Sequence, residues 1–301
     1  MQFIITVAGL GQRFKDNAIG ESQKNLSKPF ISVAGKIILQ HLTDALPKNA
    51  DYFFAIGKHL RDHLGAEFIE AEIRKLDKKN SQIIYVDYSE RGPLDTVLQT
   101  LPYVNPVLPT CVSYCDYTLK WDFKDFFRDV ISMQADAAIV SYTGFHPTFL
   151  GPNSYCHLRV KEDFSQQKAD VECSWVTDIQ EKKLFTDKLE NEWTSCGLYY
   201  FKSAQFLNEC LQAQLDQRLC HESGEYYTSL AIKAMMLKDH NCRVLNFPIS
   251  HFIQMGTPFD VQRFQFWYDY FILKKESIDS RISFTSQEET YWRNYFLKIS
   301  E

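Results

Sequence analysis

The residues best suited to chemistry lie near the start of the chain, in a glycine-rich loop and in two cations that follow it. The loop comprises Ala8, Gly9, Leu10 and Gly11, directly after an apolar run. Because glycine has no side chain, backbone N–H groups in such a loop can approach phosphate oxygens closely. Arg13 adds a planar guanidinium that can hold two of those oxygens, and Lys28 supplies a second cation. The pattern predicts a loop that binds the phosphates of a nucleotide.

Asp116 is the candidate metal ligand, because it ends the apolar run 111–115. Ligands of open α/β sheets bind beyond the carboxyl ends of the strands, so a carboxylate at that position suits Mg²⁺, with Mn²⁺ as a substitute. Mg²⁺ takes one or two carboxylates and completes its shell with phosphate oxygens and water. An acidic residue at the end of a strand also serves to start a turn, and the residues alone leave both roles open. Asp122 is expected to cap the helix that begins at Phe123.

Further short motifs follow in order along the chain. They are Arg-Gly-Pro-Leu-Asp-Thr-Val-Leu at 91–98, Glu-Lys at 181–182, Cys-Gly-Leu-Tyr-Tyr-Phe at 196–201, Gly-Glu-Tyr-Tyr at 224–227 and Gln-Met-Gly-Thr-Pro-Phe-Asp at 254–260. With the glycine loop, this series resembles the sugar-phosphate nucleotidyltransferases, also called nucleotide-sugar pyrophosphorylases. The string at 8–14, Ala-Gly-Leu-Gly-Gln-Arg-Phe, is similar to that of the capsule and surface-polysaccharide members. The resemblance spans roughly residues 1–265.

The resemblance implies a fold and a reaction. The fold would be α/β, a GT-A-like three-layer α/β/α sandwich with a mostly parallel mixed central sheet. The reaction would join an NTP, with CTP or UTP favoured, to a sugar 1-phosphate or a related small phosphate monoester. Its products would be an NDP-activated compound and pyrophosphate, for capsule or surface polysaccharide synthesis.

The resemblance to the sugar-phosphate nucleotidyltransferases also implies roles for single residues. In the nucleotide half, Arg13 would hold the β- and γ-phosphates, Lys28 the α-phosphate region, Asp116 the Mg²⁺, and Gly92 would pass against the base. In the acceptor half, Lys182 would bind the acceptor phosphate and Gly197 would back the acceptor, with Glu225 beside them. Lys183 is the alternative to Lys182.

Two positions depart from the family pattern. Asp95 stands where members commonly have a small residue, and Gln254 stands where many have a second metal-binding Asp. The second carboxylate is therefore missing or comes from elsewhere, with Glu225 as the candidate. The two departures keep open the class of a non-catalytic nucleotide-binding module. A second class also stays open, because a GT-A-type glycosyltransferase that uses a nucleotide sugar could share the fold and a metal carboxylate. The glycosyltransferase would usually show Asp-x-Asp, whereas Asp116 is followed by Tyr117 and Thr118.

Composition narrows the class of protein. With 301 residues, 45% of them apolar, the chain can bury a full core, and a net charge of −5 without a basic block argues against nucleic acid as a partner. No apolar run approaches the length of a membrane span and no signal peptide is evident, so we expect a cytoplasmic protein without membrane contact. The eight cysteines include no Cys-x-x-Cys pair and are expected to be reduced core residues. Whether copies form a homo-oligomer is left open.

The hydrophobic pattern predicts the order of elements. Strands are expected near 3–8, 52–56, 82–87, 110–115 and 136–142, with helices over 36–46, 60–76 and 122–133 between them. After about residue 150 we expect strands over 154–161, 173–181, 195–202 and 243–247, and helices over 204–219, 226–237, 258–275 and 288–297. One nucleotidyltransferase domain would then span 1–265, with its nucleotide half over about 1–145 and its acceptor half over about 146–265. Residues 266–301 would form a helical extension packed on it.

Overall fold

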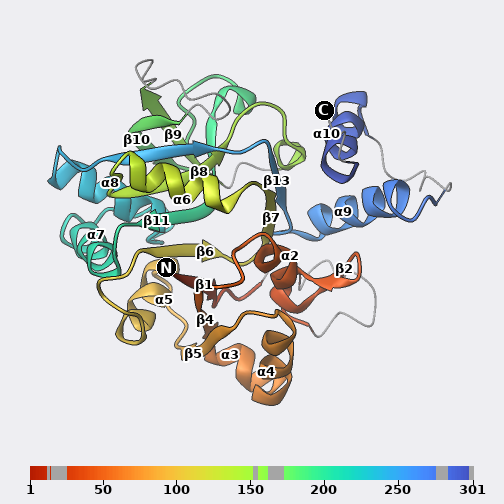
Figure 1. Cartoon of the computed structure of the whole chain (residues 1–301), viewed down its shortest axis with the longest axis horizontal. Helices are drawn as coiled ribbons and strands as arrows, with labels where there is room; N and C mark the ends of the chain where they lie inside the picture. Colours follow the sequence, from red (N-terminus) through yellow and green to blue (C-terminus); the bar gives the residue numbers. More distant parts are fainter. Residues whose placement is uncertain (12–13, 15–25, 152–154, 162–172, 276–283, 298–301) are drawn as a thin grey trace.

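The computed structural model describes residues 1–11, 14, 26–151, 155–161, 173–275 and 284–297 (Figure 1). Nine strands form its central sheet, in the spatial order β5-β4-β1-β6-β11-β8-β12-β10-β9. They are β1 (Gln2–Val7), β4 (Asp51–Gly57), β5 (Asn80–Val86), β6 (Thr110–Tyr114), β8 (Ala137–Tyr142), β9 (Cys156–Lys161), β10 (Ser174–Glu181), β11 (Trp193–Phe201) and β12 (Val244–Pro248). Only β11 and β10 run against the other strands of this sheet. The mixed, mostly parallel sheet predicted from the sequence is confirmed.

Helices cover both faces of the sheet, because successive side chains of a strand point to opposite sides. In β1, Phe3 and Ile5 belong to one buried cluster and Ile4 belongs to another. Side chains of four helices pack into the first cluster: α2 (Ile38–Asp44), α3 (Lys58–Leu64), α4 (Ala66–Lys75) and α6 (Phe123–Ser132). The second receives α5 (Pro93–Thr100), α7 (Ala204–Asp216) and α8 (Thr228–Lys238). The three layers are thus confirmed.

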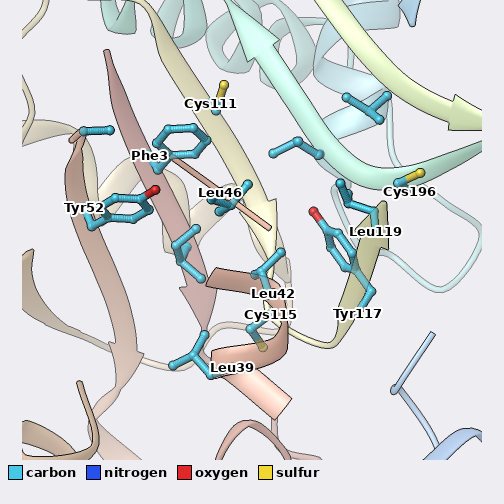
Figure 2. Close-up of a cluster of buried hydrophobic side chains, with 14 of the residues drawn as sticks. Phe3, Leu39, Leu42, Leu46, Tyr52, Cys111, Cys115, Tyr117, Leu119 and Cys196 are labelled. Atoms are coloured by element: carbon cyan, nitrogen blue, oxygen red, sulfur yellow. The ribbon is translucent and has the colours of Figure 1, made fainter. Parts of the chain in front are cut away.

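Figure 2 shows part of the first cluster, in which Leu46, just after α2, lies near Phe3 of β1, and Leu42 and Leu39 of α2 extend the same group of buried side chains. The Phe3 and Tyr52 rings stack with centroids 5.1 Å apart. Cys111, Cys115 and Cys196 are buried in the same cluster, and all eight cysteines are unbridged. The expected core position is confirmed for the five buried cysteines, which include Cys156 and Cys210, but it is wrong for the exposed Cys220, and Cys173 and Cys242 are only partly buried.

The predicted helix over 60–76 is wrong in one respect, because Gly65 divides it into α3 and α4. Gly65 has a φ of 86°, in the left-handed region that glycine enters without steric cost. Its N–H donates to Arg61 O at the end of α3, and α4 begins at the next residue. The continuous apolar spacing of the two helices concealed this break.

Two short strand pairs lie outside the main sheet. β2 (Ser32–Val33) pairs with β3 (Lys36–Ile37), so the predicted helix over 36–46 begins only at Ile38. β7 (Tyr117–Lys120) pairs antiparallel with β13 (His251–Gln254). The sequence analysis predicts neither pair, since each strand is too short to show a periodic pattern. The β7–β13 pair brings a segment from late in the chain beside the end of β6.

The C-terminal helices are α9 (Pro258–Phe271) and α10 (Ser286–Phe296), which lie beside β13 in Figure 1. Asp260 completes a capping box with Thr257 at the start of α9, and Asp122 caps α6 as expected. Trp267 and Trp292 are buried in the cluster that joins the two helices. Helix α9 continues across residue 265, where the sequence analysis places a domain boundary, and that boundary stays a prediction. In the part of the chain that the structure describes, no helix has the length and apolar character to span a membrane.

Candidate functional site

A pocket of about 480 Å³ opens at the carboxyl ends of β1 and β6. Apart from Arg13 and the alternative lysine Lys183, the candidate residues named from the sequence all line it: Ala8, Gly9, Leu10, Gly11, Lys28, Gly92, Asp116, Lys182, Gly197 and Glu225. Arg13 lies outside the described residues. Candidate residues as far apart in the chain as Ala8 and Glu225 therefore share one cavity. Such a cavity has the size of a site for a small organic ligand.

Lys28 and Asp116 form an ion pair at one side of this pocket. Asp116 lies between β6 and β7, and Lys28 begins a 3₁₀ turn, Lys28–Phe30, that is anchored by the buried Pro29 and Phe30. The Lys28 Nζ lies 2.7 Å from Asp116 Oδ2, and the side chains keep 23% and 18% of their exposure. The cation and the carboxylate are both accessible from the pocket, so each can still meet a ligand.

Gln254, at the end of β13, lies beside the same carboxylate. A Cβ built on Gly256 would stand 2.9 Å from Asp116 Oδ2 and closer still to Gln254 Nε2. The backbone holds this arrangement, since the Met255 N–H donates to Asp116 O at 2.7 Å and Gln254 pairs with Tyr117 across the β7–β13 ladder. Gly256 is required because any side chain would displace one of the two polar groups.

The loop before α5 contacts the side of the pocket that Glu225 lines. Gly92 has a φ of 73°, and a Cβ on it would stand 3.6 Å from the Glu225 Cβ. Tyr226 N–H donates to Arg91 O at 2.9 Å, and Leu94 N–H donates to Tyr226 O at 3.1 Å. The backbone bonds at Tyr226 therefore hold the segment that carries Glu225 against the Gly92 loop.

Asp95 stabilises this loop from within. Its carboxylate accepts from Arg91 Nη2 at 2.7 Å and from the Ser89 hydroxyl. Asp95 thus bonds to its own loop, and it is not among the residues that line the pocket.

Lys182 lies at the same side of the pocket as Glu225 and has a φ of 57°, an uncommon conformation for a non-glycine residue. Its Nζ donates to the Tyr227 hydroxyl at 2.5 Å and lies 3.8 Å from Glu225 Oε2. The Tyr227 hydroxyl in turn donates to Glu225 Oε2 at 2.5 Å. Lys183, by contrast, is 63% exposed and pairs with Glu222 at 2.7 Å on the surface. Of the two lysines, only Lys182 lines the pocket among the residues described.

Glu181 and Tyr227 also line this end of the pocket, although the sequence analysis assigned no role to either. The Ser229 hydroxyl donates to Glu181 Oε2 at 2.6 Å. Burial raises the pKa of Glu181 to about 7, against the opposing effects of the Ser229 hydrogen bond and the Lys182 charge. A carboxyl with such a pKa changes its protonation near neutral pH and can exchange hydrogen bonds with ligand hydroxyls. The feature of the sequence that could have identified Glu181 as a site residue is its position directly before Lys182.

Gly197 is held close to an aromatic ring. It has a φ of 84°, and a Cβ would stand 2.8 Å from Tyr114 Cδ2. The β11–β8 register shifts between Ser195 and Tyr199, so the strand is irregular at this glycine. Gly197 is therefore needed for backbone conformation and for packing on Tyr114.

The donor set at Asp116 fits a hard cation, because a carboxylate and an amide oxygen are both suitable Mg²⁺ ligands. Glu225, the alternative source of a second carboxylate, is bonded to Tyr227 and to Ser223, whose hydroxyl lies 2.9 Å away. Among the described residues, no group of three or more His, Cys, Asp and Glu side chains forms a ready metal site. An ion at Asp116 would therefore need further ligands from substrate or water.

Comparison with known proteins places the fold. No protein-family model and no curated protein match the chain. Among solved structures, it is similar to the nucleoside-diphosphate-sugar pyrophosphorylase from Vibrio cholerae RC9, with a TM-score of 0.65, 19% identity, and 87% of this chain and 99% of that chain covered. A UTP-bound UGPase from Acinetobacter baumannii aligns with a TM-score of 0.61 and 15% identity over 99% of both chains. The inositol-1-phosphate CTP transferase from T. maritima aligns with a TM-score of 0.59 and 11% identity over 86% of this chain and 90% of that chain. At these identities, the likeness establishes a shared fold.

Proposed function

We propose that this protein is a nucleotidyltransferase that joins an NTP to a phosphorylated small molecule and releases pyrophosphate. The observation that carries the proposal is that one pocket contains the glycine loop 8–11, the Lys28–Asp116 pair and Lys182. Cations at both sides of a cavity suit two phosphorylated substrates that must meet between them. The solved structures that share the fold bear the names of pyrophosphorylases and a CTP transferase, which supports the same reaction class.

In the proposed reaction, an oxygen of the acceptor phosphate attacks the α-phosphorus of the NTP in line with the leaving pyrophosphate. One P–O bond forms to the acceptor and the bond to the β-phosphate breaks. The attacking phosphate is already anionic at neutral pH, so no general base is needed. Lys28 would neutralise charge near the α-phosphate, Arg13 would hold the leaving phosphates, and Lys182 would hold the acceptor phosphate. The protein acts mainly by positioning and by neutralising charge.

Asp116 would hold Mg²⁺, or Mn²⁺ in its place, with Gln254 beside it. A bound divalent ion supplies charge neutralisation for the phosphates at the reacting centre. The chain's own contribution is to fix the carboxylate through the Met255–Asp116 backbone bond and to place Lys28 against it.

We propose CTP or UTP as the nucleotide and a sugar 1-phosphate as the favoured acceptor. The base preference rests on the resemblance of residues 8–14 and on the UTP and CTP in the names of two similar structures. Glu181 supports a hydroxylated acceptor, because its buried carboxyl lines the pocket directly beside Lys182. A place in capsule or surface polysaccharide synthesis follows from the same resemblance and is part of the proposal.

The test is a matrix of CTP, UTP, GTP, ATP and dTTP against a panel of phosphorylated acceptors, with pyrophosphate as the readout. We expect pyrophosphate only when a nucleotide and its acceptor are both present, with CTP or UTP giving the fastest release. Release of a free nucleoside diphosphate from a nucleotide sugar would instead indicate a glycosyltransferase. Nucleotide binding without turnover across the whole matrix, with Mg²⁺ and with Mn²⁺, would indicate a non-catalytic binding module.

A further inference from the structure

The Tyr227 hydroxyl lies between two charged groups of the pocket, the Lys182 ammonium and the Glu225 carboxylate. It is 2.5 Å from Lys182 Nζ and 2.5 Å from Glu225 Oε2, whereas these two atoms are 3.8 Å apart. Burial opposes ionisation of Glu225, but hydrogen bonds from the Tyr227 and Ser223 hydroxyls hold its pKa below the usual range. Burial and the bond to Glu225 raise the pKa of Tyr227 well above its usual range. At neutral pH the carboxylate is therefore ionised and the phenol keeps its proton.

These protonation states fix the direction of both hydrogen bonds. An ammonium can only donate and a carboxylate can only accept, so the hydroxyl accepts from Lys182 and donates to Glu225. The group in direct contact with the Lys182 ammonium is thus a neutral hydroxyl. A phosphate can replace a neutral partner at lower cost than a carboxylate in direct contact, because hydrogen bonds between two charged groups are stronger.

The backbone holds the three side chains in this arrangement. Glu225 and Tyr227 both line the pocket, and Tyr226 between them is bonded through its N–H and C=O to the loop before α5 and to the first turn of that helix. The Lys182 N–H donates to Tyr155 O at 2.8 Å. Without the hydroxyl, the ends of the Lys182 and Glu225 side chains would close from 3.8 Å to direct contact, because the attraction between opposite charges grows as they approach. A lysine in such a pair would have to break it before it could bind a phosphate.

We propose that Tyr227 is a positioning residue whose hydroxyl acts as a spacer: it keeps Lys182 out of direct contact with Glu225 and so leaves the ammonium available to the acceptor phosphate. The inference rests on the proposed function, which assigns the acceptor phosphate to Lys182. Tyr227 acts through this lysine and takes no part in making or breaking a bond. The hydroxyl therefore sets how strongly Lys182 can bind a phosphate.

The experiment measures how fast Lys182 of the folded protein is acetylated by an N-hydroxysuccinimide ester at fixed pH, with mass spectrometry of the digested protein as the readout. Inorganic phosphate is the probe, and chloride keeps the ionic strength constant. The phosphate concentration that halves the rate reports the affinity of this one lysine for phosphate. Inorganic phosphate has no sugar hydroxyl, so any contact of Glu225 with another part of an acceptor does not affect the result.

We expect phosphate to protect Lys182 in the wild type. Tyr227→Phe removes only the hydroxyl, since the ring, whose centroid lies 4.6 Å from the ammonium, is retained. In this variant half-protection should need about tenfold more phosphate, and the rate without phosphate should fall at least about threefold, because a direct ion pair holds the amine protonated. Tyr88→Phe is the matched control, since it removes a hydroxyl from another tyrosine that lines the pocket, and it should behave as wild type.

A second substitution separates a spacer from a merely structural hydroxyl. Glu225→Gln in the Tyr227→Phe background removes the competing charge, so the rate and the half-protection at Lys182 should return to within about threefold of wild type. A structural loss would leave the lysine impaired in both variants. Lys183, which pairs with Glu222 on the surface, is the internal control, and its rate should be equal in every variant.

The proposal is overturned if a folded Tyr227→Phe variant leaves the phosphate protection of Lys182 unchanged, or if adding Glu225→Gln does not restore it. Absence of protection in the wild type would overturn it as well. Circular dichroism melting identifies any variant that fails to fold; in that case Glu225→Gln alone decides, since it should need no more phosphate than wild type, and a higher requirement would count against the spacer. These readouts involve no turnover, so a matrix without pyrophosphate would refute the proposed function whatever the labelling shows.

Discussion

Replacing Lys182 by Met should weaken binding of the phosphorylated acceptor and leave binding of the nucleotide nearly unchanged. Met retains the length and apolar stem of Lys but has no charge, so packing on the Tyr227 ring is retained. The Lys182 side chain is 24% exposed, so its contact with a phosphate would be only partly shielded from water. Such a charged hydrogen bond contributes about 1–3 kcal/mol, which corresponds to a rise of about 5- to 150-fold in the acceptor KM.

The lower half of that range is expected, because Lys182 must exchange its bonds to Tyr227 and Glu225 for the bond to phosphate. The assay is steady-state pyrophosphate release with each substrate varied in turn. The NTP KM should change less than about threefold, since the proposed function assigns Lys182 to the acceptor phosphate and not to the nucleotide. Thermal melting checks that the variant is folded.

Lys183→Met is the matched control, since this lysine is adjacent in sequence but pairs with Glu222 on the surface. It should leave both KM values unchanged. The reasoning fails if Lys182→Met raises the KM for NTP and acceptor equally, or if Lys183→Met reproduces its effect.

Three other substitutions test separate features of the structure. Glu181→Gln should gain stability relative to wild type as pH rises from about 4.5 to 7, because over this range the carboxyl ionises in the unfolded chain while its raised pKa keeps it protonated in the folded protein. Denaturant unfolding at several pH values should show a plateau of about 3 kcal/mol above pH 7, and a pH-independent difference would contradict the assignment. Gly256→Ala should lower turnover by up to about 100-fold, because the added Cβ displaces the ends of the Gln254 and Asp116 side chains. The melting temperature should change little, since the backbone is not displaced. Unchanged pyrophosphate release would show that the positions of these two side chains do not matter for turnover. Glu288→Gln should lower the free energy of unfolding in urea by about 3–5 kcal/mol, because it leaves the buried Arg263 guanidinium without its carboxylate. A loss below about 1 kcal/mol would show that this ion pair contributes little to the stability of the C-terminal helices.

The sequence predicted the sheet and its helices well because their hydrophobic patterns are long and regular. Strands β1, β4 and β6 lie within one or two residues of the predicted ranges. The break at Gly65 was missed, since the apolar spacing continues across it and only the φ of 86° reveals the turn. The β7–β13 pair was missed because antiparallel pairing between residues more than 130 positions apart leaves no local pattern.

The shared pocket follows from the order of the motifs, because the loops after parallel strands meet at one edge of the sheet. What the sequence could not provide are the contacts between residues distant along the chain. Lys28 touches Asp116, and Gln254 lies beside the same carboxylate only because β13 pairs with β7. Tyr227 was missed as a site residue, since its bonds to Lys182 and Glu225 depend on how α8 starts against β10. The role of Arg13 and the domain boundary stay predictions.

The most direct test of the central claim is the fate of the α-phosphorus of the nucleotide. The protein is incubated with CTP or UTP labelled at the α-phosphorus, Mg²⁺ and a panel of sugar 1-phosphates, and the products are separated. We predict that the label enters a compound in which the nucleotide is joined to the acceptor phosphate, that unlabelled pyrophosphate forms in equal amount, and that Asp116→Asn abolishes both. Label recovered only in unreacted NTP, or in free nucleoside monophosphate or diphosphate, would contradict the account.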